Sequence, residues 1–206
     1  IIPPVAKPGQ PAVGGLAMAD RSLVRRLRDA EQLAARGEYS SAVRIFGLLL
    51  AAEGDFYCQP DRNVPVFRHL KSAAESMLGS MPDEGRAAYE LQYGAEARRR
   101  LDAAVRGTDR RELAQVSQDY FYTEAGAEAT YLLGTTYWQA GQWFSAAACW
   151  QRLADSGQRA RRFEPALSLP LAACWLALGE PSRVSERLEI LKARHAGTAI
   201  EIDGRA

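Results

Sequence analysis

The chain has 206 residues, of which 47% are hydrophobic and 25% charged, and its formal net charge at pH 7 is +1. This is the composition of a folded globular protein and not of a disordered one. The charge balance lacks the basic excess of a dedicated nucleic-acid-binding protein, so we expect no nucleic-acid partner. Because no stretch reaches the roughly 20 apolar residues that cross a membrane, the sequence also predicts no transmembrane segment.

Residues 1–19 are rich in proline and glycine and predict a flexible linker. The first residue is Ile1 and not methionine, so we expect a processed or excised part of a longer sequence. A helical domain is predicted over residues 20–196. Residues 197–206 are predicted to form a C-terminal extension and are a candidate start of a following β domain, because residues 199–202 alternate as a strand does.

Residues 21–50 predict the first pair of helices, with Gly37 in the turn between them. Apolar and small residues recur with the period of a helix on both sides of this glycine. Asp29 stands where the later pairs have leucine, so this pair is a weaker copy of the pattern, as terminal repeats often are.

The middle of the chain predicts more helices. Residues 54–65 contain two prolines, which interrupt a helix, but their aromatic residues predict a segment that folds back on the first pair. Residues 119–123 are predicted to be an aromatic plug that ends the middle region. The predicted helices run from Val66 to Leu78, from Glu84 to Val105 with a break or kink at Gly94, and from Arg110 to Ser117.

Residues 128–153 carry the clearest pattern, two amphipathic helices joined by a tight turn at Gly141. This glycine follows the first helix, at a position where a positive φ is favourable only for glycine. Gly134 and Ala146 stand where the two helices are expected to come closest, and a larger side chain would push them apart. The larger side chains expected to fill the space to the next pair are Tyr137, Trp150 and Leu153.

This alternation of small and large residues is typical of a tetratricopeptide (TPR) unit, a helical hairpin that buries its apolar face by stacking on similar hairpins. Residues 165–194 fit it too, with Gly179 in the turn and Pro181 at the start of the second helix. The frame that begins at Ala127 begins again at Pro165, 38 residues further on. Since the usual period is about 34, about four residues are extra at the junction. We therefore predict an all-α fold, a TPR-like α-solenoid of about eight or nine stacked helices.

TPR arrays bind proteins or peptides on a concave surface lined by the first helix of each hairpin. In the best repeat the candidate partner-binding residues are Glu128, Tyr131, Thr135, Trp138 and Gln139. In the next repeat the same positions are Ala166, Leu169, Ala173, Leu176 and Ala177. Trp138 and Tyr131 are the expected anchors, because large aromatic rings dominate interface energies. Two interpretations of the apolar positions stay open: they receive an amphipathic helix or extended peptide, or the chain itself covers them.

The sequence predicts no catalytic site, no metal site and no cofactor. The two histidines, His69 in a helix and His195 at a helix end, lack metal-ligand spacing and are expected to be structural. Cys149 and Cys174 are expected to be buried thiols, and whether they form a disulfide is left open. The short arginine runs have acidic residues nearby and are interpreted as solvated helix faces.

Three segments resemble the helical modules that precede quinoprotein-like β-propeller repeats in some bacterial cell-envelope proteins. They lie in residues 78–101, 119–134 and 163–179, and the most particular match is Pro82-Asp83-Glu84-Gly85 followed by Tyr89 and Gln92-Tyr93-Gly94. The resemblance implies a non-catalytic scaffold in the periplasm or cell envelope. Its implied partner is another protein or peptide, or a β-propeller domain of the same polypeptide.

An alternative function comes from the dipeptide Glu75-Ser76, which also occurs at the catalytic acid of helical lytic transglycosylases. That likeness implies an accessory or catalytic helical domain of a peptidoglycan-active enzyme. The segment that follows, Gly79-Ser80-Met81-Pro82, departs from the family's pattern. Incubation with peptidoglycan and analysis of the products separates this function from the scaffold.

Overall fold

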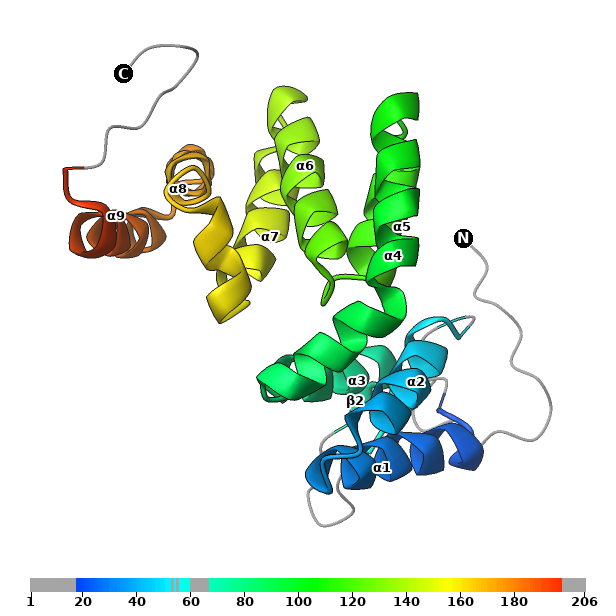
Figure 1. Ribbon diagram of the computed structural model, residues 1–206. Helices are drawn as coiled ribbons and strands as arrows, with labels where there is room; N and C mark the ends of the chain where they lie inside the picture. The colour runs from blue at the N-terminus through cyan, green and yellow to red at the C-terminus, as the bar shows by residue number, and fades with distance from the viewer. Residues whose placement is uncertain (1–17, 53, 55, 60–66, 198–206) are drawn as a thin grey trace. The chain divides into compact units, whose positions relative to one another are not determined.

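The fold is mostly helical, as the sequence predicts. A computed structural model of the protein describes residues 18–52, 54, 56–59 and 67–197 (Figure 1). These residues form nine α-helices, one 3-10 helix and one small sheet of two short strands. Among them, no helix combines the length and apolar character that a membrane span requires. The predicted strand at residues 199–202 and most of the predicted N-terminal linker lie outside the described residues.

Contacts between Cα atoms divide the chain into two compact units, residues 1–95 and residues 96–206. The division falls inside helix α4 (Asp83–Gly107), which is continuous. The break predicted as one alternative at Gly94 is therefore wrong, whereas the kink stays a prediction; the boundary between the units follows Gly94 by one residue. A glycine costs a helix roughly 1 kcal/mol and does not by itself end it.

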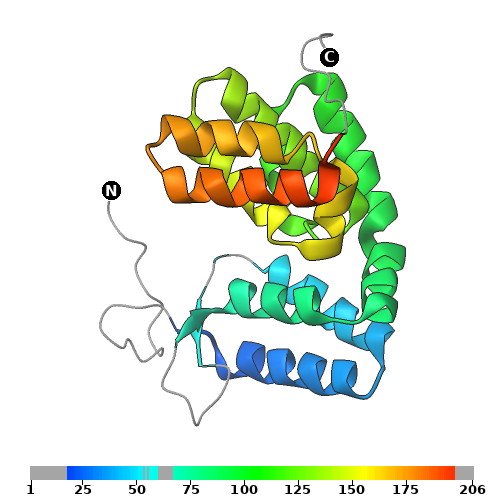
Figure 2. The same cartoon turned by 90° about the vertical axis from the view of Figure 1, so that its left-hand side faces the viewer.

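Unit 1 is built on the first predicted pair of helices, α1 (Arg21–Ala35) and α2 (Tyr39–Leu50). Helix α1 begins where the side chain of Asp20 accepts a hydrogen bond from the backbone N–H of Ser22 at 3.0 Å. Helix α3 (Leu70–Ser80) follows, later than predicted, and packs against α2 (Figure 2). Core side chains from these helices and α4 include Leu27, Val43, Phe46, Leu70, Leu78 and Tyr89.

Unit 1 also contains a two-stranded antiparallel sheet, β1 (Tyr57–Cys58) and β2 (Arg68–His69), which the sequence does not predict. His69 is thus in a strand and precedes α3, and its predicted place within a helix is wrong. The backbone N–H of Ala19 donates to the carbonyl of Tyr57 at 2.8 Å, so the end of the predicted linker lies beside β1. This pairing confirms that the chain around Tyr57 folds back to the start of the first helical pair.

Unit 2 contains the second half of α4 and then α5 (Arg110–Asp119), α6 (Glu124–Gln139), α7 (Trp143–Ala154), the 3-10 helix η1 (Gly157–Phe163), α8 (Ser168–Ala177) and α9 (Pro181–His195). From α5 onward each α-helix packs mainly against its neighbours in sequence. Helix α6 lies between two buried clusters, one shared with α4 and α5 and the other with α7 and α8. The extra residues predicted at the junction of the last two pairs form η1.

The helix pairs share one type of turn. The residue after each turn glycine donates its N–H to a carbonyl five residues earlier: Gln142 to Tyr137, Glu180 to Trp175 and Glu38 to Leu33, each at 2.9 Å. Gly141 has φ +70°, as the sequence predicts. At the α4–α5 corner the same bond runs from Asp109 to Ala104, and Thr108 takes the positive φ, at 52°.

The turn geometry predicts opposite effects of one substitution at two helix ends. A Cβ added to Gly141 or Gly107 would meet no atom within 4 Å, but only Gly141 has a positive φ. We expect Gly141→Ala to lower the free energy of unfolding by about 1 kcal/mol and Gly107→Ala to raise it by about 0.5 kcal/mol. Urea unfolding followed by circular dichroism measures both, and equal effects would contradict the turn assignment.

Gly134 makes the close approach that the sequence predicts, and the side chain it meets is that of Trp150. A Cβ on Gly134 would overlap the indole ring of Trp150. The indole Nε1 donates to the carbonyl of Tyr131 at 3.2 Å, and the ring is 2% exposed. Trp150 and Leu153 lie in the cluster that joins α7 to α8, so they fill the space between successive pairs as predicted.

Substitution at this contact tests the packing of α6 on α7. Gly134→Leu and Ala146→Leu are expected to lower the free energy of unfolding by about 1–3 kcal/mol or more, because neither buried site has room for the added atoms. Gln142→Ala, at an exposed position in the same hairpin, is the control and should change it by less than about 0.5 kcal/mol. Thermal melts that rank the control as the most damaging variant would refute the assigned helix pairing.

Candidate partner-binding face

The candidate residues predicted in the best repeat lie on one face of α6. Glu128, Tyr131, Thr135 and Trp138 are half-buried, and Gln139 is exposed. The rest of the helix carries the buried residues Ala125, Ala127, Ala129, Thr130 and Leu133. We refer to the five candidate residues as the α6 face.

The N-terminal end of the α6 face is charged. Glu128 accepts a hydrogen bond from Arg98 of α4 at 2.8 Å and lies 3.6 Å from Arg162 of η1. Arg162 also lies 3.5 Å from Glu124. The hydrogen bond from Arg98 to Glu128 holds the pKa of Arg98 above its ordinary value. Since Glu128 already binds two arginines, it organises this end of the face and is not an isolated acidic contact.

The C-terminal part of the α6 face is aromatic. The ring of Tyr131 stacks on Phe163 of η1 with centroids 5.2 Å apart. The ring of Trp138 lies 4.9 Å from Trp143 and 5.8 Å from Trp150. Burial raises the pKa of Tyr131 above its ordinary value. The two predicted anchors therefore pack against the core with one side of each ring.

Phe163 and Trp143 belong to this aromatic group, and sequence reasoning missed both. Phe163 lies in the junction that the repeat pattern treats as extra, so the frame gives it no position. Trp143 begins α7, on the far side of the Gly141 turn from Trp138. The predicted hairpin could have indicated Trp143, because residues close to the turn on its two antiparallel helices lie near each other.

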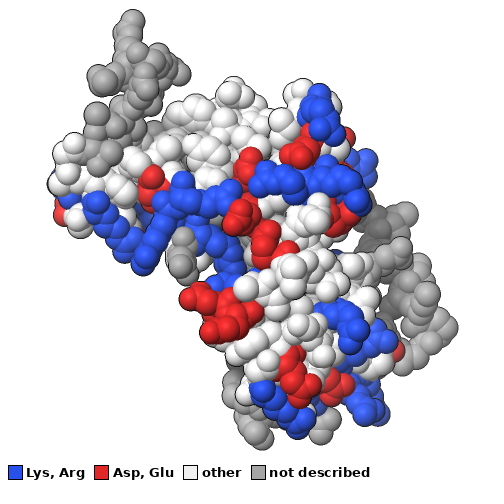
Figure 3. Space-filling view, viewed as in Figure 1, with Lys and Arg blue, Asp and Glu red and all other residues white. Residues whose placement is uncertain are grey.

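The apolar positions of the next repeat form a strip along α8, with Ala166 just before the helix, and we refer to these five residues as the α8 strip. Leu176 is 68% exposed, Ala166, Ala173 and Ala177 are exposed as well, and Leu169 is half-buried. The inner side of α8 is buried in the same cluster that Tyr131 and Trp138 contact. Figure 3 shows an uncharged area over the upper part of this side of the molecule, with a band of arginines and acidic residues across its middle. Within unit 2 the described residues thus leave the α8 strip open.

The other groups with potential chemistry belong to other helices. Glu75 is half-buried and Ser76 exposed on α3, and His195 is the last residue of α9. The described residues contain no group of three or more His, Cys, Asp or Glu side chains that would hold a metal ion. Arg100, in one of the predicted basic runs, hydrogen-bonds Glu112 at 2.6 Å and lies 3.5 Å from Asp119, so it links α4 to α5.

The three cysteines are free thiols. Cys174 is buried in the cluster between α7 and α8, whereas Cys149 packs against the cluster on the other side of α6. Burial is the main cause that raises the pKa of each of these two thiols to about 11. Cys149 and Cys174 therefore do not form a disulfide with each other, because the two side chains belong to different cores.

From the burial of these two thiols we expect slow chemical modification and a lower free energy of unfolding at high pH. An unfolded thiol has a pKa of about 8.5, so folding favours the protonated form of Cys149 and Cys174. The resulting stabilisation is present below about pH 8.5 and is lost as the pH rises toward 11.

We expect a chromogenic disulfide reagent at pH 8 to label these two cysteines far more slowly in the native protein than in denaturant. Equal rates in the two conditions would show that they are accessible.

No protein-family model, curated protein or solved structure matches this chain significantly.

Proposed function

We propose that this chain is a non-catalytic, TPR-like scaffold that binds a protein or peptide through the α6 face and the α8 strip. The observation that supports it most is the exposure of a row of apolar side chains on α8, a helix whose inner side belongs to the cluster that Tyr131 and Trp138 contact. Exposed apolar surface is a feature of interaction sites. An amphipathic helix or an extended peptide is the partner whose chemistry fits such a surface.

A solenoid arrangement of the helices is part of this proposal. It is supported by the packing of each helix against its neighbours in sequence, by the shared hydrogen-bonded turn, and by the recurrence of small and large residues at equivalent places. Helix α9 fits a terminal position, since most of its surface is charged or polar and a terminal repeat needs a polar outer side.

The proposed setting follows from the resemblance in sequence. The segments that contain Pro82-Asp83-Glu84-Gly85 and Gln92-Tyr93-Gly94 support a module of a bacterial cell-envelope protein that precedes a β-propeller. In that setting the partner is a second envelope protein or the propeller of the same polypeptide. This part of the proposal rests only on the resemblance in sequence.

Leu176 gives the sharpest test of the binding surface. Trp138 is less suitable, because its ring touches buried Trp150 and its removal disturbs the core. Leu176→Glu places a charge on the strip, and we expect it to abolish capture of the partner from a bacterial envelope extract. The same substitution at Leu91, which is 88% exposed on α4 in unit 1, is the matched control.

Both variants are expected to change the free energy of unfolding by less than about 0.5 kcal/mol, because both positions are exposed. The captured protein is then purified and its affinity for each variant measured by calorimetry. Equal binding by the Leu176→Glu variant and the wild type would refute the assigned surface. A loss of binding by both variants would show that the effect of the charge is not specific to α8.

A further inference from the structure

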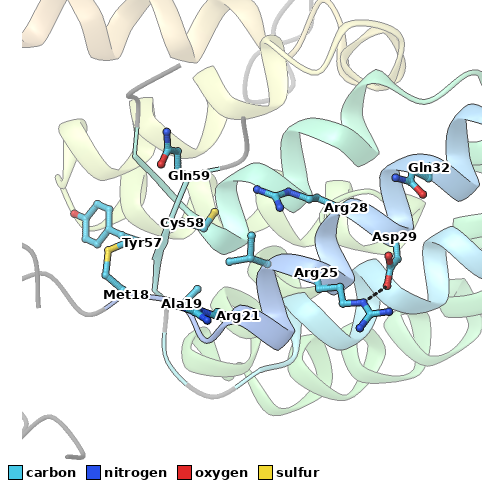
Figure 4. Close-up of a pocket in the computed structure, with 11 residues that line it drawn as sticks. Met18, Ala19, Arg21, Arg25, Arg28, Asp29, Gln32, Tyr57, Cys58 and Gln59 are labelled. Atoms are coloured by element: carbon cyan, nitrogen blue, oxygen red, sulfur yellow. Dashed lines mark ion pairs between the residues drawn. The ribbon is translucent and has the colours of Figure 1, made fainter. Parts of the chain in front are cut away.

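An open groove in unit 1 lies between α1 and β1 (Figure 4). Its volume is about 710 Å³. One wall is α1, and the other is β1 with Gln59, which follows the strand. Met18 and Ala19 also line it, where the chain runs beside Tyr57 before it enters α1.

The α1 wall is basic. Arg21, Arg25 and Arg28 recur at the spacing of one helix face and extend over about 10 Å of the helix axis. The acidic side chain among the lining residues is Asp29, 4.0 Å from Arg25. In this pair 84% of the arginine side chain and 51% of the aspartate side chain are exposed, so the attraction is weak. Arg21 and Arg28 form no ion pair with any residue that the structure describes.

The opposite wall suits an extended chain. β1 pairs with β2 along one edge, and Ala19 donates its N–H to the Tyr57 carbonyl on another side at 2.8 Å. The segment of Met18 and Ala19 turns away from β1 at Asp20, which caps α1. Beyond this point Cys58 and Gln59 line the groove. Buried Cys58 on β1 and half-buried Val24 on α1 give the groove an apolar part.

We infer that this groove binds an extended acidic segment of a partner protein. Arginine guanidinium groups form paired hydrogen bonds with carboxylates, and within the described part of the chain Arg21 and Arg28 form no ion pair. In an extended chain, side chains two residues apart lie about 6.8 Å apart on one side, so two carboxylates fall within reach of Arg21 and Arg28. The residues between them point the other way, toward the apolar part of the groove.

This site is independent of the proposed function of unit 2, and its test uses the full chain. The probe is a fluorescein-labelled peptide in which glutamate and valine alternate, and binding is followed by fluorescence anisotropy. We expect saturable binding to the wild type. The double variant Arg21→Gln/Arg28→Gln should bind about tenfold more weakly or worse, because it removes two charge-assisted contacts.

The matched control is Arg26→Gln/Arg36→Gln, which changes the net charge equally at two exposed arginines outside the groove. It should alter the affinity by less than about twofold in physiological salt, since screening weakens distant charges. Equal losses in the two double variants, or non-saturable binding to the wild type, would overturn the proposal. Equally tight binding of labelled single-stranded DNA that also depends on Arg21 and Arg28 would overturn it too, in favour of a general anion site.

Discussion

The packing of Trp150 into the space beside Gly134 is the contact on which most of unit 2 depends. It lets α6 and α7 approach closely, and the hydrogen bond from the indole to the Tyr131 carbonyl satisfies the polar atom of a ring that is otherwise buried. The same ring contacts Trp138 and lies in the cluster that receives α8. One side chain therefore fixes the hairpin, orients the aromatic part of the α6 face and supports the next helix. A change of volume there would be felt at each of these places, because the core is close-packed.

On the other side of α6 the packing is held partly by polar contacts. The hydroxyls of Ser117 and Thr130 lie 2.7 Å apart in a buried position between α5 and α6. Thr123 caps α6 through the N–H of Gly126, where a Cβ would collide with the backbone of Tyr120. Arg152 of α7 adds a hydrogen bond to the Ser117 carbonyl and covers the ring of Phe121. Because buried polar groups are costly when unpaired, these contacts favour one arrangement of the corner over others.

The two candidate binding surfaces differ in the interactions that they can form with a ligand. The α6 face and α8 strip present aromatic and aliphatic area, with charge confined to the paired groups around Glu128. The groove in unit 1 presents arginines, two of which form no ion pair with a described residue, next to a short strand. The first surface gains affinity from burial of apolar area, and the second from charge-assisted hydrogen bonds. The salt dependence of binding is expected to distinguish them, since screening acts on exposed charges and barely on apolar contacts.

The sequence by itself determined the helical class and the positions of the hairpin turns. These properties are local: they follow from the period of a helix, from the conformational freedom of glycine and from the sizes of neighbouring side chains. The strands β1 and β2 were decided by tertiary structure, because two residues leave no period to read and their pairing joins distant parts of unit 1. The same holds for the partners of Glu128, for the place of Phe163 beside Tyr131 and for the separation of Cys149 from Cys174. The basic groove likewise arises only when α1 and β1 lie side by side, because an arginine row on a helix looks like a solvated face until a wall is placed opposite it.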